Sequence, residues 1–158
     1  MQKITPFLWF NDNAGEAIEL YTSIFKNSKT INVHRYGKSG PGPEGTIMTG
    51  TIELEGQQFM LLNAGPMYSF NPSISFYVNC EGQEEVDYYW NRFIESGGKE
   101  SRCGWLEDKF GVSWQIIPSV LSKLLGDPDQ GRAGRAMKAM MQMVKLDIAA
   151  LQAAADNK

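Results

Sequence analysis

The sequence has little of what metal sites and disulfide frameworks need, because its 158 residues include one histidine and two cysteines. Cys80 and Cys103 have no Cys-x-x-Cys spacing, so we expect two reduced thiols that behave as small buried hydrophobic groups. Positive charge is also scarce, since 15 lysines and arginines stand against 18 acidic residues for a net charge of −3. Nucleic-acid binding usually requires a basic surface, and we therefore expect no nucleic-acid partner.

Long apolar runs are missing as well. The mean hydropathy is −0.32, and no stretch reaches the ~20 apolar residues that a membrane-spanning helix needs. No apolar segment with basic flanks near the start suggests a signal peptide. We expect a cytoplasmic protein without a membrane partner. The length fits one domain, or two small copies of a module, and supports a core without a structural metal.

What the sequence does contain is an internal repeat. Thr5–Asn11 aligns without a gap on Ser73–Asn79, a shift of 68 residues. Both segments are rich in β-branched and aromatic residues and predict a strand, and apolar residues at helical spacing follow each of them. Asn13 and Glu16 have the spacing of a capping pair for the first helix. Gly97-Gly98 predicts the end of the second helix.

Short β patterns complete each copy of the repeat. The first copy continues with predicted strands at 30–36, 46–54 and 57–63, and the second with strands at 102–107 and 112–118. The Gly- and Pro-rich stretch Gly37–Gly45 predicts an exposed loop over a sheet edge. We therefore predict an α+β fold of two tandem βαβββ modules that pair to close a cleft. The predicted domain covers residues 1–118, with module one at 1–68 and module two at 69–118.

Residues 119–158 form a predicted C-terminal helical extension. They carry six basic and four acidic residues, whereas residues 1–118 carry nine and fourteen. Val120–Leu125 predicts a short helix, and Ala133–Ala155 predicts one long amphipathic helix. Its apolar stripe would pack on the sheet or across a dimer, and it consists of Met137, Met140, Met141, Val144, Ile148 and Leu151.

Four segments of the chain resemble the PhnB-like subfamily of the glyoxalase, or vicinal-oxygen-chelate, superfamily. They are Ile74–Cys80, Glu85–Trp90, Cys103–Gln115 and Ala136–Met143. The resemblance implies the tandem βαβββ fold and a homodimer. Members often carry the label 3-demethylubiquinone 3-methyltransferase, but the only Gly-rich loop, Gly40–Gly45, precedes no helical pattern that would cradle S-adenosylmethionine. We therefore expect no methyl transfer and interpret this loop as a lid or hairpin tip.

The resemblance also implies where metal ligands would stand. In metal-dependent members of the superfamily they lie on the first and last strands of each module, and these positions correspond here to Thr5, Met60, Ser73 and Gln115. Four neutral, weak donors do not repay the dehydration of a divalent ion. We expect neither a metal nor another cofactor.

Strand alternation extends these positions to an apolar and aromatic cleft with a few hydroxyls, a composition typical of small-molecule sites. The alternative is that the same side chains fill the space between the half-sheets. The predicted ligand-binding residues are Thr5, Phe7, Trp9, Met60, Leu62, Ser73, Ser75, Tyr77, Gln115 and Ile117.

His34 is the one candidate catalytic residue, since alternation would point Asn32, His34 and Tyr36 at the cleft and an imidazole can act as a general base. The alternative is a strand histidine without a chemical role. Asp108 and Gly111 fit a tight turn better than acid–base chemistry.

Three hypotheses of function follow. The leading one is a metal-independent protein that binds a small molecule, with or without catalysis. A second is an enzyme that uses His34 and polar cleft groups for proton transfer or isomerisation. A third is a resistance-type dimer that sequesters a cationic drug, which the acidic composition favours.

Overall fold

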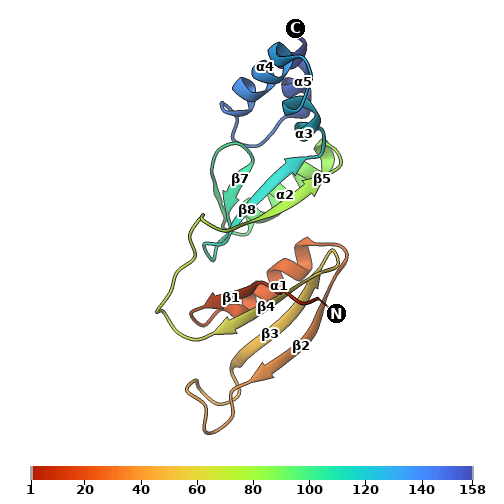
Figure 1. The fold of residues 1–158 in the computed structure, drawn as a ribbon. Coiled ribbons are helices and arrows are strands. Elements are labelled where there is room, and N and C mark those ends of the chain that lie inside the picture. Colours follow the sequence, from red (N-terminus) through yellow and green to blue (C-terminus); the bar gives the residue numbers. More distant parts are fainter. Residues whose placement is uncertain (1, 158) are drawn as a thin grey trace. The chain divides into compact units, whose positions relative to one another are not determined.

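The computed structural model describes residues 2–157 and divides the chain into two compact units, the first ending at Phe70 and the second starting at Asn71. Each unit begins with the predicted βαβββ order, so the α+β fold is confirmed (Figure 1). The first unit contains β1 (Phe7–Phe10), α1 (Ala14–Ile24), β2 (Ser28–Arg35), β3 (Ile47–Leu54) and β4 (Gln57–Asn63). The second contains β5 (Ser75–Cys80), α2 (Gln83–Glu95), β6 (Lys99–Glu100), β7 (Trp105–Glu107) and β8 (Ser113–Pro118), and then α3 (Val120–Leu125), α4 (Gln130–Met140) and α5 (Ile148–Asp156).

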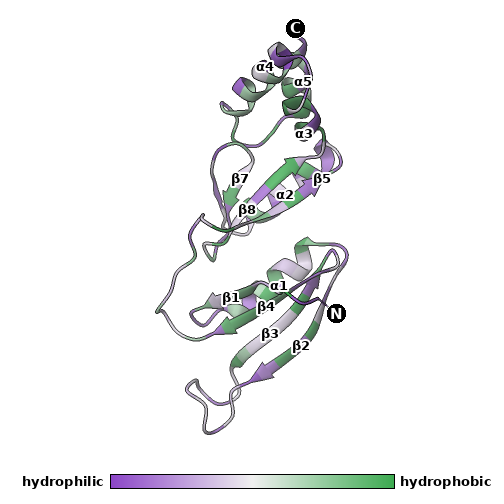
Figure 2. Cartoon of the chain, in the orientation of Figure 1, coloured by the Kyte–Doolittle hydropathy of each residue, from purple (hydrophilic) through white to green (hydrophobic). Residues whose placement is uncertain are grey.

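The sheet of the first unit has the strand order β1-β4-β3-β2. β1 runs parallel to β4, and the other neighbours are antiparallel. α1 covers one face, where its Ala17, Tyr21 and Ile24 are buried. The helix lies close to the sheet at Gly50, because a Cβ there would stand 2.4 Å from Ile18 Cδ1. Buried apolar residues of the helix and the strands form the core of this unit, and the ribbon of α1 and β4 includes hydrophobic stretches, drawn in green (Figure 2).

The start of α1 differs from the predicted capping pair. Asn13 occupies the N-cap position with φ −111° and ψ 22° and makes no side-chain capping bond. The Ala14 N–H instead donates to Asn63 Oδ1 at 2.8 Å. The Asn63 side chain at the end of β4 therefore satisfies the first N–H of the helix, and Asn13 does not form the side-chain capping bond that the sequence predicts.

The second unit repeats this plan with the order β5-β8-β7-β6. α2 buries Val86, Trp90 and Phe93, and the rings of Phe93 and Trp114 are 4.9 Å apart. The helix ends at Glu95, and Gly97 adopts a positive φ of 104°, so the predicted Gly-Gly stop is confirmed.

The prediction of one long helix from Ala133 to Ala155 is wrong. α4 ends at Met140 and α5 starts at Ile148, with an irregular segment between them. Two carbonyls of that segment, those of Met143 and Val144, accept the N–H groups of Cys103 and Gly104. Asp147 then caps α5 through the Ala150 N–H. The segment after α4 therefore forms hydrogen bonds with Cys103 and Gly104, just before β7, and does not continue as a helix.

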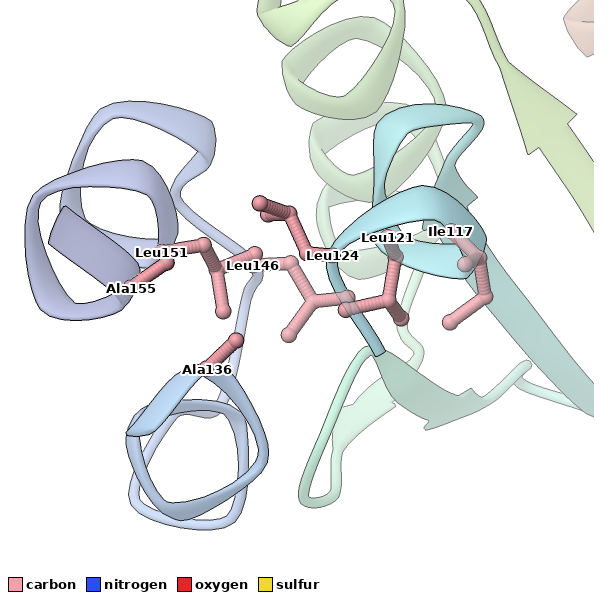
Figure 3. Close-up of a cluster of buried hydrophobic side chains, with 7 residues drawn as sticks. All are labelled: Ile117, Leu121, Leu124, Ala136, Leu146, Leu151 and Ala155. Atoms are coloured by element: carbon pink, nitrogen blue, oxygen red, sulfur yellow. The ribbon is translucent and has the colours of Figure 1, made fainter. Parts of the chain in front are cut away.

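The break lets α4 and α5 fold against α3 around one hydrophobic cluster. Figure 3 shows its side chains gathered between the helices and the end of β8. The cluster consists of Ile117, Leu121, Leu124, Ala136, Leu146, Leu151 and Ala155. The predicted apolar stripe is therefore divided, because Leu151 is buried here whereas Met137, Met141 and Val144 are exposed.

The segment between α4 and α5 is also fastened to the start of α2. The Gln83 side chain donates to the Leu146 carbonyl at 3.0 Å and accepts from the Ile148 N–H at 2.8 Å. Lys145 forms an ion pair with Asp87 at 2.8 Å. Within residues 2–157, no helix has the length and apolar character needed to cross a membrane.

Candidate functional site

The first unit presents an apolar sheet face on the side opposite α1. Phe7 pairs with Met60 and Trp9 with Leu62, so these four side chains share one face, as strand alternation predicts. Phe7 is 50% exposed, whereas Leu8 between them is buried toward the helix. This open face thus carries two aromatic and two aliphatic side chains that the core does not use.

A row of polar groups borders these residues. Thr49 stands between Leu62 on one side and His34 on the other, and Thr51 stands between Met60 and Asn32. His34 lies on the exposed edge strand, and its neighbour across the ladder is a hydroxyl and not a carboxylate. The open face therefore changes from apolar to hydroxyl-bearing toward β2.

Tyr36 does not join this row, contrary to the predicted alternation. The register shifts between His34 and Arg35, and such an irregularity redirects the side chains that follow. Tyr36 is buried, and its hydroxyl donates to the Asn63 carbonyl at 2.6 Å. Of the three predicted residues, only Asn32 and His34 lie on the open face.

Local contacts fix two other predicted residues of the first unit. The Trp9 indole N–H donates to the Gly65 carbonyl at 2.9 Å, and the Tyr68 ring packs edge-on at 5.0 Å. Thr5 precedes β1, where its hydroxyl accepts a 3.3 Å bond from Gln2. These contacts with Gly65 and Tyr68, and not contacts with other residues of the open face, fix the orientation of the Trp9 ring.

The second unit places Tyr77 opposite Gln115 on the face away from α2. Tyr77 is 56% exposed, and the Gln115 amide donates to Ser75 Oγ at 2.9 Å. Ser73 lies before β5, and its N–H and hydroxyl both donate to Asn71 Oδ1. Ile117 is only 3% exposed and belongs to the cluster of Figure 3, so its side chain is core and not an open lining.

The strand registers also reassign one pair of equivalent residues. Met60 pairs with Phe7, which stands two residues after Thr5. Gln115, its repeat equivalent, pairs with Tyr77, which stands two residues after Ser75. Thr5 is therefore equivalent to Ser75 and not to Ser73, as the 68-residue shift suggested. The sequence alignment could not show this two-residue difference, because Thr5–Asn11 aligns on Ser73–Asn79 without a gap.

Titratable groups on β5 are held in their protonated forms. Burial raises the pKa of the Cys80 thiol to about 12, and the nearby Glu85 carboxylate adds to the rise. Burial also raises the pKa of Tyr77, with a smaller contribution from Cys80. At neutral pH, Cys80 is an unreactive thiol and Tyr77 presents a phenolic hydroxyl.

The donors at the positions that hold metal ligands in metal-dependent members of the superfamily do not fit a divalent ion. After the reassignment they are a threonine, a methionine, a serine and a glutamine, all neutral and weak. Among residues 2–157, no three His, Cys, Asp or Glu side chains lie close enough together to hold a metal. No chemical step through a metal is therefore derived for this site.

Two βαβββ units with open faces and this connectivity define the fold of the glyoxalase, or vicinal-oxygen-chelate, superfamily. Residues 2–117 match the family described as 3-demethylubiquinone-9 3-methyltransferase. The chain belongs to this PhnB-like family, as the sequence resemblance implied.

Solved structures agree with this assignment. A PhnB protein from Bacillus cereus, described by the same methyltransferase name, is 38% identical with a TM-score of 0.69, covering 75% of this chain and 100% of that one. A Pseudomonas aeruginosa protein is 22% identical with a TM-score of 0.61, over 72% and 95% of the chains. The fosfomycin resistance protein FosX from Listeria monocytogenes, solved with Mn(II) and sulfate, is 13% identical with a TM-score of 0.51, over 72% and 88%. The last two likenesses concern the fold alone. No curated protein is similar enough to count as a match.

The methyltransferase name belongs to the family, and the Gly-rich loop does not fit the cofactor that it implies. S-adenosylmethionine is usually cradled by a Gly-rich turn between a strand and a helix. Here the loop 36–46 connects the antiparallel strands β2 and β3. No step through that cofactor is derived.

Proposed function

We propose that this chain is a metal-independent protein that binds a small molecule on the open faces of its half-sheets. The observation that carries the proposal is the face of the first unit, where Phe7, Trp9, Met60 and Leu62 form an apolar surface opposite α1. Sheets normally bury such a face against another layer or a ligand.

The chemistry of that face favours a flat, partly aromatic ligand. Because the Trp9 N–H is already bonded to Gly65, its indole ring offers stacking area and no unpaired polar atom. Thr49 and Thr51 lie beside Leu62 and Met60 and can bond the polar edge of a ligand. An apolar body with one hydrogen-bonding edge matches this arrangement.

The second unit has its own set of polar groups on β5 and β8. Tyr77 offers an exposed ring with a hydroxyl that is protonated at neutral pH, as for an ordinary tyrosine, and burial raises its pKa further. A glutamine amide has two N–H groups and an acceptor oxygen, and the Gln115 bond to Ser75 uses one of these N–H groups. This face therefore suits a neutral hydrogen-bonding group better than a free charge.

A fragment screen followed by backbone amide NMR tests the proposal. A binding fragment is expected to shift the amides of β1 and β4, of β5 and β8, or of both. Replacing the exposed ring of the face whose amides shift, by Phe7→Ser in the first unit or Tyr77→Ser in the second, should weaken that fragment about tenfold or more. Met67→Ser is the matched control, because Met67 is exposed but lies outside the strands. Shifts confined to other surfaces, or equal losses in all three variants, would contradict the proposal.

The catalytic hypothesis rests on His34 and is tested with the same fragment. Since His34 lies on the edge strand, one strand further than Thr49 from Leu62 and the other apolar residues, we propose that binding does not need it. His34→Gln should change the fragment's Kd by less than about twofold. Loss of binding, or turnover of a bound compound that disappears in His34→Gln, would favour the enzyme over the binding protein.

We further propose a homodimer that uses the C-terminal helices. Three apolar side chains of this region, Met137, Met141 and Val144, are exposed. Exposed apolar groups of this kind often mark association surfaces. Light scattering should give a dimer for the native chain and a monomer for Met141→Glu. A native monomer would refute this part of the proposal.

A further inference from the structure

A cavity of about 560 Å³ lies at one end of the first unit's sheet, and none of the open-face residues lines it. Asn11 and Asp12 of the turn between β1 and α1 form one wall, and Ala64 and Gly65 after β4 form another. The loop between β2 and β3 contributes residues from Pro41 to Pro43. Cavities of this volume are typical of small-molecule sites.

Asn63 holds these walls together. It is only 9% exposed, and its side chain accepts from the Ala14 N–H at 2.8 Å and donates to the Ile47 carbonyl at 3.1 Å. Its carbonyl accepts the Tyr36 hydroxyl at 2.6 Å. One buried residue thus joins the start of α1, the start of β3 and the end of β2. Such a network gives the cavity a fixed shape.

The loop between β2 and β3 packs directly against the Tyr36 ring. A Cβ on Gly42 would stand 2.4 Å from two ring carbons, and one on Gly40 would stand 2.9 Å from another. Tyr36 cannot easily move away because its hydroxyl is bonded to Asn63. Only glycine lets the loop approach this closely, so the loop is packed onto the ring as a cover for the cavity.

The charges of the lining indicate the kind of ligand. Asp12 is the one charged side chain among the lining residues that the structure describes, beside the apolar groups of Pro41, Pro43 and Ile47. The first N–H of α1 is already bonded to Asn63, so it is not free for an anion. We propose that this cavity binds a small molecule that carries an ammonium group and a compact apolar body. The ammonium would pair with Asp12 and the apolar body would lie against the prolines.

Three probes of similar shape and different charge test the proposal near neutral pH. They are benzylamine, which is protonated, benzyl alcohol and benzoate. Benzylamine should shift the amide signals of Gly42 and Gly65 and bind at least about fivefold more tightly than benzoate. Asp12→Asn should abolish that preference, whereas Glu44→Gln, which removes the same charge from a loop residue outside the lining, should retain it. Equal binding of the three probes, no shift at these glycines, or equal effects of the two variants would overturn the proposal.

The cover is tested separately by two alanine variants. Gly42→Ala forces a methyl group against Tyr36, whereas Gly37→Ala meets no atom within 4 Å. Gly42→Ala should weaken benzylamine several-fold with an unchanged urea midpoint, and Gly37→Ala should bind normally. Identical affinities in the two variants would refute the role of the loop. Because the cavity and the open sheet faces share no residue, failure here leaves the proposed function standing, and the reverse also holds.

Discussion

The Gln115 side chain donates a 2.9 Å hydrogen bond to Ser75 Oγ across the parallel pair β5 and β8. These residues occupy the positions that correspond to Met60 and Thr5 in the first unit. Where metal-dependent members of the superfamily are expected to place ligands, the second unit of this chain has an amide and a hydroxyl bonded to each other. Both groups are neutral, so they stabilise each other without a cation.

A double-mutant cycle measures this pair. Gln115→Ala and Ser75→Ala should each lower the free energy of unfolding by about 1 kcal/mol or less, because the groups are half-buried and can turn to water. The coupling energy from urea unfolding should be about 0.5–1 kcal/mol. Strictly additive effects would show that the bond contributes nothing in solution.

Asp108 is expected to be structural and not catalytic. It is 2% exposed, and its carboxylate accepts the N–H groups of Phe110 and Val112 and the indole N–H of Trp114. Asp108→Ala would leave these donors unpaired and should cost about 3 kcal/mol or more in the free energy of unfolding. Glu107→Gln, one residue earlier and half-buried, should cost under about 1 kcal/mol. Equal costs in urea unfolding would contradict the assigned role.

Leu146 should hold the C-terminal helices on the second unit. It is fully buried in the cluster of Figure 3, whereas Val144, two residues earlier, is exposed. Leu146→Ala should lower the free energy of unfolding by about 2–5 kcal/mol because it leaves a cavity. Val144→Ala should change it by less than about 1 kcal/mol. A mild Leu146 variant would mean that the helices add little to this unit.

The ion pair of Asp87 with Lys145 predicts an acid-sensitive attachment of the same region. Hydrogen bonds from Lys145, and then from Gln83, lower the pKa of Asp87 below its ordinary value. The folded form therefore binds a proton less readily than the unfolded chain. The stabilisation is present at neutral pH and is lost as the pH falls below about 4.

Urea unfolding at several pH values checks this prediction. Asp87→Asn should reduce the loss of stability between neutral and acid pH, and Glu95→Gln, an exposed carboxylate on the same helix, should leave it unchanged. The same acid slope in the native chain and in Asp87→Asn would exclude the proposed contribution.

The tandem fold could be predicted from the sequence because each module has a recognisable local pattern of residues. Strand and helix periodicities follow each other in the same order twice, and Thr5–Asn11 matches Ser73–Asn79 without a gap. The end of α2 at the glycine pair followed from the freedom of Gly97 to adopt a positive φ. These features depend on neighbouring residues, so the sequence carries them.

Features that depend on distant partners could not be predicted in this way. Asn63 accepts the first N–H of α1 only because β4 ends beside that helix. The long C-terminal helix breaks because Cys103 and Gly104 bond the carbonyls of residues 143 and 144. Ile117 has the alternation of a cleft residue but is covered by helices that follow it. The hydrophobic periodicity of a helix or strand indicates that element alone and does not show which other segments pack against it.

The candidate cavity could not be predicted from the sequence, although the Gly-rich loop beside it is interpreted there as a lid or hairpin tip. Asp12, Tyr36 and Asn63 are separated by 24 and 27 positions in the chain, and only the sheet topology brings their segments together. The clue that could have been used is the alternation Gly40-Pro41-Gly42-Pro43, since closely spaced glycines often mark close approach to another group.

The central claim, that this family member binds a small molecule without a metal, is tested most directly by calorimetry on chelator-treated protein. Elemental analysis of the same sample establishes its metal content, and a fragment identified on the open sheet face serves as the titrant. We predict that its Kd is the same within about twofold in chelator-treated protein and after addition of Mn²⁺ or Zn²⁺. Binding that disappears on chelation and returns with one metal ion per chain would contradict the claim.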